Sequence, residues 1–463
     1  MVEWSDLQEQ VLGEFLIADI TVKNTTPVII GGYNAKPYSR KLNLMEEPRP
    51  TEIKGLWRWW ARALVSGVLF SEGKAITIDE ADKIISYVLG GTTEEGTTPS
   101  KITLKVKVLN MTSRLLNSDE VDKIPRLKLL KMKAKEAFDE RFYVYDDLKL
   151  RIGLYAHEGI NPKDVPSYKF AFASLILSLI FSGIGAITNR AFGSLMIEIE
   201  NLKLGNKLIQ HLGHYLNIIR NIYGESSIEN IKSSLWSLIS NSLKDAREYV
   251  GSISNVEIQG QRSLSLPLMP SIVMGNSNVF RLEIKPCRAH DVIDLLGTIG
   301  NSVLKQAMKQ PCYGINKRRS GVNIHTFILG LPRSSKTSYG NIELRTGYIV
   351  SLCKTNHTPS LIHDPREAKR CEDSEKTGKL RRLSTIGFTV LRRDSRPLVL
   401  VYGMLAEDIN EIKKDIVHRG VIGKPGRKGY VRRVIDTPLC NVDIIREFNR
   451  LWNCIVNVFL RRC

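Results

Sequence analysis

The N-terminal part of the chain alternates between strand and helix patterns. Apolar residues recur every three to four positions over residues 51–68 and 167–181, which is typical of helices that bury one face. Short apolar runs, or alternation of apolar and polar residues, predict strands at 15–22, 101–108, 148–155 and 195–204. The order strand, helix, strand, strand, helix, strand predicts a ferredoxin-like sandwich, in which an antiparallel sheet carries two helices on one face.

Strand patterns return in the C-terminal part of the chain. They lie at 279–286, at 322–332 and over 381–403, where a hairpin is predicted, with a helix over 291–308. Helical patterns fill residues 205–253, and a basic amphipathic helix over 117–142 is predicted as an insertion. We therefore expect an α+β fold of two ferredoxin-like (RRM-like) domains with helical insertions. The expected divisions are 1–204, 205–253 and 254–463.

Composition places the chain among ordinary folded proteins. Its 463 residues are 43% hydrophobic and 25% charged, which excludes a disordered, collagenous or coiled-coil protein. The opening residues lack the basic end and the apolar core of a signal peptide. The uncharged stretch 170–188 is interpreted as a buried helix that ends in a tight loop, and not as a membrane span. Seven scattered cysteines without a CxxC pair are interpreted as reduced thiols, so we expect a cytoplasmic protein with no membrane partner.

Positive charge is concentrated at one end of the chain. The net charge is +19, and residues 301–463 carry 31 basic against 14 acidic side chains, whereas residues 1–300 carry 36 against 34. A field of one sign attracts polyanions and speeds their encounter. Nucleic acid is therefore the first partner that the sequence predicts, and an acidic protein or an anionic membrane is the second.

The helix at 51–68 carries a basic stripe, which we define as Lys54, Arg58 and Arg62. Their spacing of four places them on one side of the helix, roughly opposite its apolar face, where they can meet phosphate. Of the three tryptophans in this helix, two are expected to be buried. Trp59 lies on neither the apolar face nor the stripe, so it is expected to stack a base or to pack against a neighbouring subunit.

A glycine loop, residues 182–194, joins the second predicted helix to the last predicted strand. Its sequence is SGIGAITNRAFGS. Gly183, Gly185 and Gly193 allow close backbone approach and positive φ angles, so the amides can point at a phosphate while Arg190 supplies positive charge.

These two segments together resemble a known family. TPVIIGGYNAK, then RPTEIKGLWRWWARALVSG, then GIGAITNRAFGSL are similar to the RAMP superfamily of CRISPR proteins. Within that superfamily they resemble the first-numbered RAMP subunit of the Cmr complex, the type III-B RNA-guided effector of antiviral defence. The family loop usually carries more arginine, and glycine at positions 187, 189 and 191, so the phosphate grip of this loop is expected to rest on Arg190. More loosely, the LGLPR turn and the Arg-Arg-initiated strand in the C-terminal half also resemble the family.

The resemblance implies a non-catalytic RNA-binding subunit. The sequence has no cofactor motif and no close cluster of metal ligands, so no cofactor and no metal site are expected. Its partners are then the guide RNA (crRNA), which it contacts in the 3′ part, the adjacent single-stranded target RNA, and other Cmr subunits. We expect cations, glycine amides and exposed aromatic rings to bind RNA of any sequence, and base pairing with the guide to supply the specificity. The residues expected to contact RNA are Tyr33, Lys36, Lys54, Arg58, Trp59, Arg62, Gly183, Gly185, Arg190, Gly193, Lys317, Arg318, Arg319, Arg333, Lys336, Arg381 and Arg382.

Two other functions stay open at this stage. Some RAMP relatives are metal-independent endoribonucleases with a general-base histidine, for which His325 and His157 are candidates, although the chain has none of the common nucleotide-binding or hydrolase motifs. The other alternative is an assembly protein, whose Trp59 and basic stripe dock an acidic partner subunit.

Two weaker motifs have structural interpretations. His211 and His214 are three residues apart, a spacing found in metal sites, but no third ligand lies nearby in the sequence, and we interpret them as structural. The GKPG at 423–426 has the form of a KH-module clamp, but a strand pattern follows it, so a basic hairpin is the favoured interpretation.

Overall fold

The contacts of the chain divide it into two compact units. The computed structural model describes residues 15–30, 38–39, 44–93, 96–131, 142–253, 264–314, 326–329, 335–339, 342–350, 361–363, 384–393, 396–409, 416–422, 433–439 and 442–461. The first unit comprises Met1–Asn301, Ile386–Met404 and Phe459–Cys463, and the second comprises Ser302–Thr385 and Leu405–Val458. The hairpin over 386–404 belongs to the first unit because it pairs with a strand of that unit. The expected divisions at 204 and 253 stay predictions.

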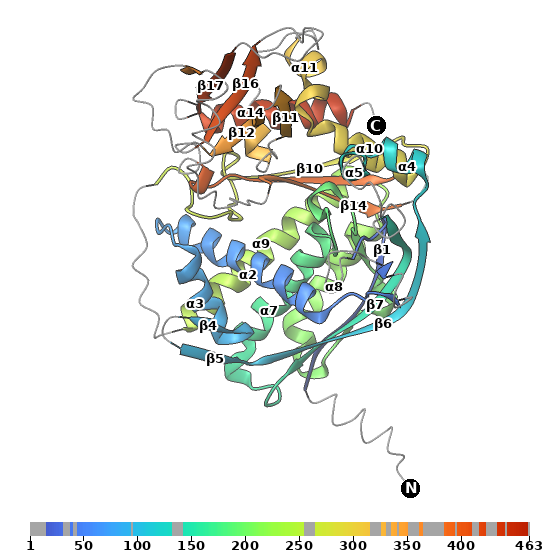
Figure 1. Cartoon of the computed structure of the whole chain (residues 1–463). Coiled ribbons are helices and arrows are strands. Elements are labelled where there is room, and N and C mark those ends of the chain that lie inside the picture. The colour runs from blue at the N-terminus through green and yellow to red at the C-terminus, as the bar shows by residue number, and fades with distance from the viewer. Residues whose placement is uncertain are drawn as a thin grey trace. The chain divides into compact units, whose positions relative to one another are not determined.

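The first unit contains most of the secondary structure (Figure 1). Its strands are β1 (Leu16–Asn24), β2 (Tyr38–Ser39), β3 (Leu44–Met45), β4 (Gly90–Thr93), β5 (Gly96–Ser100), β6 (Ile102–Leu115), β7 (Tyr143–Ala156), β8 (Leu195–Ile197), β9 (Lys203–Leu204), β10 (Phe280–Pro286), β14 (Ile386–Arg392) and β15 (Leu398–Met404). Its helices are α2 (Pro50–Ser71), α3 (Ile78–Leu89), α4 (Ser118–Lys123), α5 (Pro125–Lys131), α7 (Val165–Phe181), α8 (Ile209–Gly224), α9 (Ile228–Ser252) and α10 (Val292–Ser302). Short 3-10 turns lie at Pro162–Asp164, Thr188–Arg190, Ile199–Asn201 and Asn206–Leu208.

The N-terminal sheet has the strand order β6-β7-β1-β8, and β9 pairs with the same edge of β1 as β8, nearer to the start of β1. All its pairings are antiparallel. β1 and β6, which are linked through α2, lie on either side of β7, so the crossover is split by a third strand as the predicted ferredoxin-like order requires. The α+β class is confirmed, and the number of ferredoxin-like domains stays a prediction.

Helix α7 is the central helix of the first unit. All but a few residues at its N-terminal end are buried, because it packs against α2, α9 and the sheet. The expected buried helix is therefore confirmed. Among the described residues, Pro162–Phe181 is the one helical segment long and apolar enough to cross a membrane, and 78% of its apolar window is buried inside the fold.

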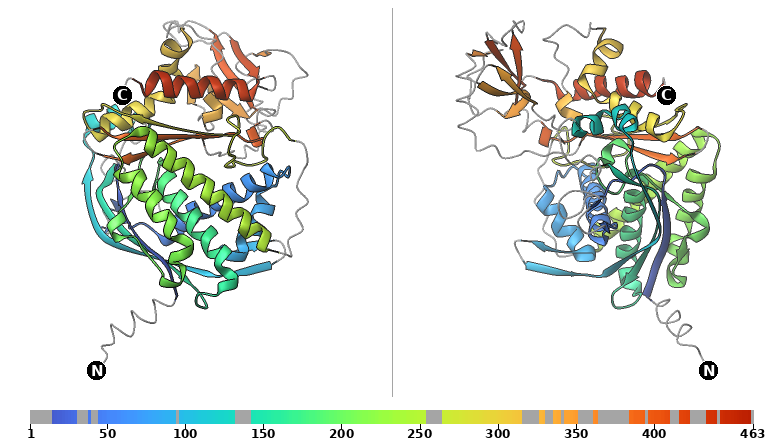
Figure 2. Two further views of the ribbon diagram at one scale, coloured as in Figure 1. Left: turned by 180° about the vertical axis from the view of Figure 1, so that it is seen from behind. Right: turned by 45° about the vertical axis from the view of Figure 1, so that its right-hand side comes forward.

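Helices α8 and α9 confirm the helical pattern expected over 205–253. Figure 2 shows them side by side from behind. The buried hydroxyl of Tyr215 on α8 donates to the carboxylate of Asp245 on α9 at 2.7 Å. On α9, Tyr249 stacks on Phe170 of α7 with ring centroids 4.4 Å apart. These contacts place both helices in the core of the first unit.

Three predicted elements differ in the structure. The strand expected at 195–204 is interrupted by a 3-10 turn, Ile199–Asn201, between β8 and β9. The helix expected at 291–308 is two helices, α10 and α11 (Lys305–Tyr313). In the strand expected at 322–332, the described residues Thr326–Leu329 form a 3-10 turn that buries Ile328. Short apolar runs fit a buried strand or a buried turn equally well, so periodicity did not separate them.

The C-terminal strands belong to two different sheets. β14 and β15 form the predicted hairpin and pair with β10 in a three-stranded sheet of the first unit. The second unit has a five-stranded sheet of order β11-β12-β16-β17-β13, in which the antiparallel pair β16-β17 confirms the predicted basic hairpin. The elements of the second unit are β11 (Ser335–Tyr339), β12 (Ile342–Val350), β13 (Leu361–His363), β16 (Ile416–Ile422), β17 (Arg433–Pro438), α11, α14 (Ile444–Cys454) and a π-helical turn, Ile455–Phe459.

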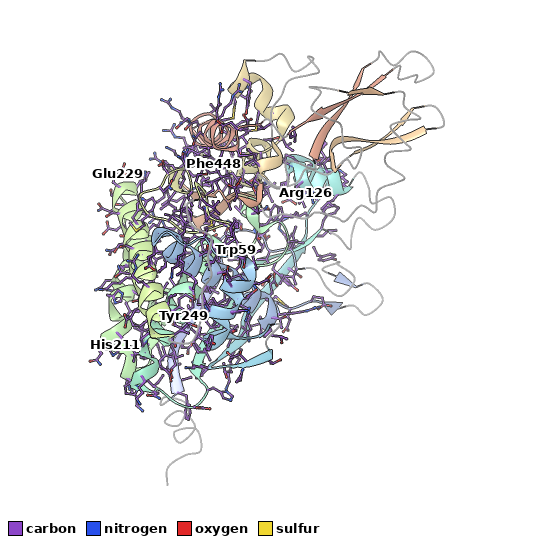
Figure 3. The ribbon with its side chains drawn as sticks, turned by 90° about the vertical axis from the view of Figure 1, so that its left-hand side faces the viewer. Trp59, Arg126, His211, Glu229, Tyr249 and Phe448 are labelled. Atoms are coloured by element: carbon purple, nitrogen blue, oxygen red, sulfur yellow. A yellow bond between two sulfur atoms is a disulfide. The ribbon has the colours of Figure 1, made fainter. Side chains whose placement is uncertain are left out.

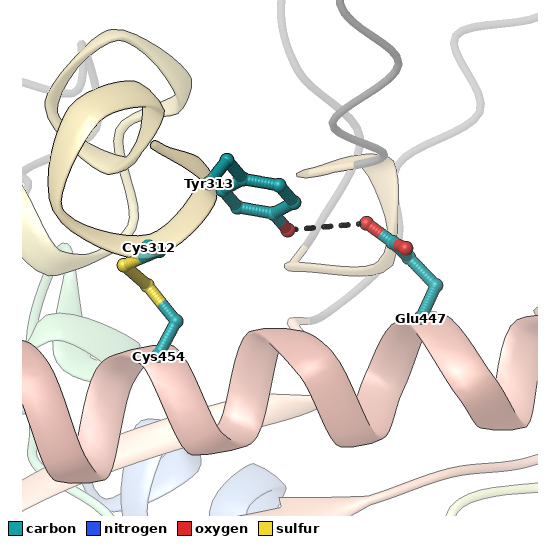
Figure 4. The surroundings of a disulfide bond; sticks show 4 residues. All are labelled: Cys312, Tyr313, Glu447 and Cys454. Carbon is teal, nitrogen blue, oxygen red and sulfur yellow. Dashed lines mark hydrogen bonds between the residues drawn. A yellow bond between two sulfur atoms is a disulfide. The ribbon is translucent and has the colours of Figure 1, made fainter. Parts of the chain in front are cut away.

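A disulfide bond in the second unit corrects the interpretation of the cysteines. Cys312 of α11 is bonded to Cys454 of α14 across 142 residues of sequence (Figure 4). Beside it, the hydroxyl of Tyr313 donates to the carboxylate of Glu447 at 3.3 Å, and the guanidinium of Arg450 lies 3.8 Å from the Tyr313 ring centroid. The interpretation of all seven cysteines as reduced thiols is wrong, because helix packing brings together two residues that sequence spacing does not relate.

Candidate nucleic-acid interface

Helix α2 begins where proline and a carboxylate favour a helix N-terminus. Pro50 occupies the first turn, where its missing N–H is not needed, and Glu52 lies near the positive end of the helix dipole. The buried residues include Ile53, Trp57 and Leu64, as the periodicity predicted. The exposed side of the first turns therefore presents Arg49, Thr51 and Lys54.

The two buried tryptophans join α2 to the rest of the first unit. The indole N–H of Trp57 donates to the carbonyl of Ala171 and to the hydroxyl of Ser174, both at 2.9 Å. The indole N–H of Trp60 donates to the hydroxyl of Ser182 at 2.7 Å. Because each buried N–H has a partner, both rings are buried without leaving a donor unsatisfied. The expectation that two of the three tryptophans are core residues is confirmed.

Trp59 of α2 is only partly buried, unlike Trp57 and Trp60; its position is labelled in Figure 3. Its ring is partly exposed and meets the Trp60 ring edge to face, with centroids 5.0 Å apart. One side of the ring therefore packs on the core, and the rest is available to a base or to another protein.

The basic stripe is partly neutralised within the fold, because two of its three cations share one carboxylate. Arg62 Nε lies 2.8 Å from Oδ1 of Asp82 on α3, and a terminal nitrogen of Arg58 lies 3.1 Å from the same oxygen. Arg58 also donates to the carbonyl of Gly90. The helical wheel of α2 did not reveal this pairing, because Asp82 comes from another helix. Within the described part of the chain, Lys54 makes no ion pair and is half-buried.

The amides of the glycine loop donate to groups within the protein. Gly185 N–H donates to the carboxylate of Glu52, and Gly193 N–H donates to the carbonyl of Pro27 at 2.9 Å. Both glycines have positive φ, +90° and +64°. A Cβ at Gly185 would overlap the carbonyl of Ile29, and one at Gly193 would overlap that of Ile184. These two glycines and Gly183, whose Cβ would also overlap backbone, permit close packing. Because the amides of Gly185 and Gly193 already have acceptors, a phosphate would have to compete for them.

Arg190 points at the β14 strand. Its guanidinium donates to the carbonyl of Ile386 at 3.3 Å and lies 5.9 Å from the ring centroid of Phe388. Burial, and to a smaller extent the neighbouring Arg126, lower the pKa of Arg190 to about 10, so the side chain is still charged at neutral pH. Through these contacts Arg190 joins the glycine loop to the β14-β15 hairpin. The sequence predicted Arg190 only as the phosphate ligand of the loop.

Two residues of the loop have strained backbone. Ile187 and Ala191 both have φ of 65°, at positions where the family usually carries glycine. A β-branched side chain in this region costs about 1–2 kcal/mol. Ile187→Gly is therefore expected to leave the free energy of unfolding unchanged or to raise it by up to about 1 kcal/mol. Urea denaturation of the full chain measures the change. The matched control, Ile160→Gly, is also half-buried but has no positive φ, and it is expected to destabilise. Equal losses of unfolding free energy in both variants would contradict the proposal that the backbone at Ile187 is strained.

The first turn of α2 and the glycine loop together line a shallow depression. Its lining residues are Arg49, Thr51, Glu52, Gly185 and Ala186. Burial raises the pKa of Glu52, while the Gly185 amide and Arg49 act in the opposite direction. Arg49 was not among the predicted contacts, although its place just before the helix-starting proline was a usable signal. Its guanidinium forms an ion pair with the carboxylate of Glu46, with a nitrogen–oxygen distance of 2.9 Å, and the side chain is half exposed.

The other residues singled out in the sequence are the histidines, Lys336 and a set that lies outside the described residues. The described histidines form no metal cluster: among the described residues no group of three histidines, cysteines or acidic residues could hold an ion. His211 lies against Gln210, His214 against the Tyr215 ring, and His157 is exposed after β7. Lys336 lies in β11, and its backbone alone is described. The predicted RNA contacts Tyr33, Lys36, Lys317, Arg318, Arg319, Arg333, Arg381 and Arg382 lie outside the described residues and stay predictions. The candidate general base His325 and the GKPG at 423–426 also lie outside them.

The sequence of this interface region matches a known class of proteins. A model of the RAMP superfamily matches residues 21–196, which run from β1 to β8 and include both α2 and the glycine loop. The predicted resemblance to the RAMP superfamily is confirmed. More particularly, the chain is 25% identical over 300 residues to the CRISPR system CMR subunit Cmr1 of Saccharolobus solfataricus. The aligned residues cover 49% of this chain and 62% of that relative, which is less than two thirds of its length.

Solved structures of Cmr assemblies share the fold. One chain of a type III-B Cmr-beta complex bound to cognate target RNA aligns with a TM-score of 0.55 and 15% identity, covering 96% of this chain and 100% of that one. A chain of the same kind of complex, bound to target RNA and AMPPnP in the presence of single-stranded DNA, aligns with a TM-score of 0.53 and 17% identity, covering 96% and 99%.

Proposed function

We propose that this protein is a non-catalytic, RNA-binding subunit of a type III-B CRISPR effector complex. The observation that carries the proposal is that the RAMP match covers the residues that bring α2 and the glycine loop together. In this proposal the subunit contacts the 3′ part of the guide RNA and the adjacent target RNA, beside other Cmr subunits, in cytoplasmic antiviral defence. The net charge of +19 supports a polyanionic partner.

The contacts proposed for RNA are narrower than the basic stripe. Arg49, which is also paired with Glu46, immediately precedes α2 and lines the depression. Lys54 is a half-buried residue of the first turns of α2, near the helix N-terminus, where anions are favoured. Arg58 and Arg62 share one carboxylate, so together they add about one positive charge to this surface. Trp59 offers a partly exposed ring for stacking. Such contacts read the backbone and the faces of bases, so the binding is sequence-tolerant.

The test is a charge reversal at the depression. Arg49→Glu combined with Lys54→Glu is expected to weaken binding of single-stranded RNA about tenfold and equally for unrelated sequences, because two phosphate contacts are lost. The slope of log affinity against log salt should fall by about 1.4. Fluorescence anisotropy of the purified full chain with labelled RNA at several salt concentrations measures both quantities.

A matched variant controls for net charge. Arg220→Glu with Lys244→Glu makes the same change on exposed positions of α8 and α9, and it is expected to bind RNA like the unmodified protein. Equal losses in both double variants would reject the depression as a site. Loss for one RNA sequence alone would reject sequence-tolerant binding.

An assembly role is the second candidate, and the partial neutralisation of the basic stripe favours it. Because Asp82 pairs with both arginines, the α2 surface carries less free charge than its sequence indicates, and Trp59 remains as an apolar contact. An assembly protein would show no RNA affinity in the same titration while it still entered the complex. The length of the RNA after incubation, with and without a chelator, distinguishes a binding protein from an endoribonuclease.

A further inference from the structure

The N-terminal sheet has an outer face that no part of the proposed function uses. The pairing registers separate its residues into two sets, because neighbouring side chains on a strand point to opposite faces. Ile20, Ile152 and Val106 share the face that packs on the helices. The opposite set, which we call the outer face, contains the cationic residues Lys23, Lys105, Lys107, Lys149, Arg151 and Lys203.

Acidic side chains balance only part of this charge. Asp19, in the middle of the outer face, is paired with Arg151, and Lys149 lies 2.7 Å from a carboxylate oxygen of Glu198. Among the described residues, Lys23, Lys107 and Lys203 make no ion pair. The outer face is therefore a positively charged surface within residues 1–300, whose overall charge is nearly balanced.

An aromatic ring lies flat on the same face. Tyr155 of β7 crosses Gly153, and a Cβ at Gly153 would lie 2.5 Å from the Tyr155 ring, so the glycine is what leaves room for it. The ring is partly exposed, and Lys105 Nζ lies 5.0 Å from its centroid. A flat ring with cations around it matches the chemistry of a nucleotide, which has a π-face and a phosphate.

We propose that the outer face is a second binding site, for single-stranded RNA, with one base stacked on Tyr155 and the backbone along Lys105 and Lys107. An exposed contact between an ammonium and a ring is weaker than base stacking. A base therefore displaces Lys105 from the ring, and the released ammonium meets a phosphate. A duplex has no free base face to offer, and an acidic protein gains nothing from a ring that lies flat on the sheet.

The stacking is tested by two substitutions at one position. Tyr155→Leu keeps an apolar side chain over Gly153 and is expected to weaken binding of a short single-stranded RNA at least about fivefold, whereas Tyr155→Phe keeps the affinity within about twofold. Thermal melting of both full-length variants establishes that they are folded. If Tyr155→Leu binds as tightly as Tyr155→Phe, or if a duplex of the same length competes equally well, the stacking is rejected.

The charges are tested independently of α2. Lys105→Glu with Lys107→Glu is expected to lower the salt slope by about 1.4, and the Arg220→Glu, Lys244→Glu control leaves it unchanged. Photocrosslinking of thiouridine-labelled RNA should label the peptide that contains Tyr155, also in the Arg49→Glu, Lys54→Glu variant. If no crosslink maps to β6 or β7, the second site is rejected, and the proposed function is unaffected. Loss of crosslinks at α2 alone rejects the α2 site and leaves this one standing.

Discussion

Gly193→Ala is expected to lower the free energy of unfolding by about 3 kcal/mol or more. Gly193 has φ of +64°, a conformation that an alanine side chain disfavours, and the added Cβ would overlap the carbonyl oxygen of Ile184. The loop has no room to shift, because Gly193 N–H donates to the carbonyl of Pro27 and the neighbouring Ile184 N–H donates to Gly193 itself. Urea or guanidinium denaturation of the full chain measures the loss.

A glycine in a helix provides the control for this substitution. Gly213 lies within α8, and a Cβ there would have nothing within 4 Å. Gly213→Ala is therefore expected to raise the free energy of unfolding by about 0.5–1 kcal/mol, because alanine is the better helix former. If Gly193→Ala were as stable as Gly213→Ala, the close packing of the glycine loop would be contradicted. The contrast separates a steric requirement from a general preference for glycine.

Trp60→Ala is expected to destabilise the protein by about 4 kcal/mol. The Trp60 ring is fully buried, and it packs on Phe181 and Tyr402 with centroids 5.1 and 5.4 Å away. Its indole N–H also donates a hydrogen bond to the hydroxyl of Ser182, which is the first residue of the glycine loop. Removing the ring leaves a cavity among α2, α7 and β15, three elements that the protein cannot easily bring closer together. Denaturation of the full chain measures this change as well.

The adjacent tryptophan distinguishes core packing from a surface role. Trp59→Ala is expected to destabilise by only about 1 kcal/mol, because its ring is partly exposed and has no buried hydrogen bond to lose. The same variant is expected to weaken RNA binding if Trp59 stacks a base. Equal destabilisation by Trp59→Ala and Trp60→Ala would show that the two rings are not buried differently.

Some features of the candidate interface were predictable because they depend on local spacing. The apolar face of α2 follows from residues three and four apart, and the structure buries Ile53, Trp57 and Trp60 accordingly. The glycines of the loop follow from the need for positive φ, which Gly185 and Gly193 have. What these glycines do was predicted incompletely, because their amides donate to Glu52 and Pro27, which lie far from them in the sequence.

Long-range contacts decided the electrostatics. The stripe Lys54, Arg58 and Arg62 was placed correctly on one side of α2, but the neutralising carboxylate belongs to α3, twenty residues beyond Arg62. Likewise Arg190 was identified as the cation of the loop, and only its neighbour β14, almost two hundred residues later, shows where it points. Two opposite charges attract when the fold brings them close in space, however far apart they are in the sequence. A helical wheel or a spacing rule therefore cannot identify the partners of an ion pair.

The sequence alone predicted β1, β6, β7, α2 and α7 of the first unit, the buried side of α2 and the resemblance to the RAMP superfamily, because periodicity and short motifs act between near neighbours in the chain. The tertiary structure decided which charges are paired, that Cys312 meets Cys454, and that the cations of β1, β6 and β7 gather on one face around Tyr155. The physical reason is register: one residue of slip would send every one of those side chains to the opposite face, and only strand pairing specifies it.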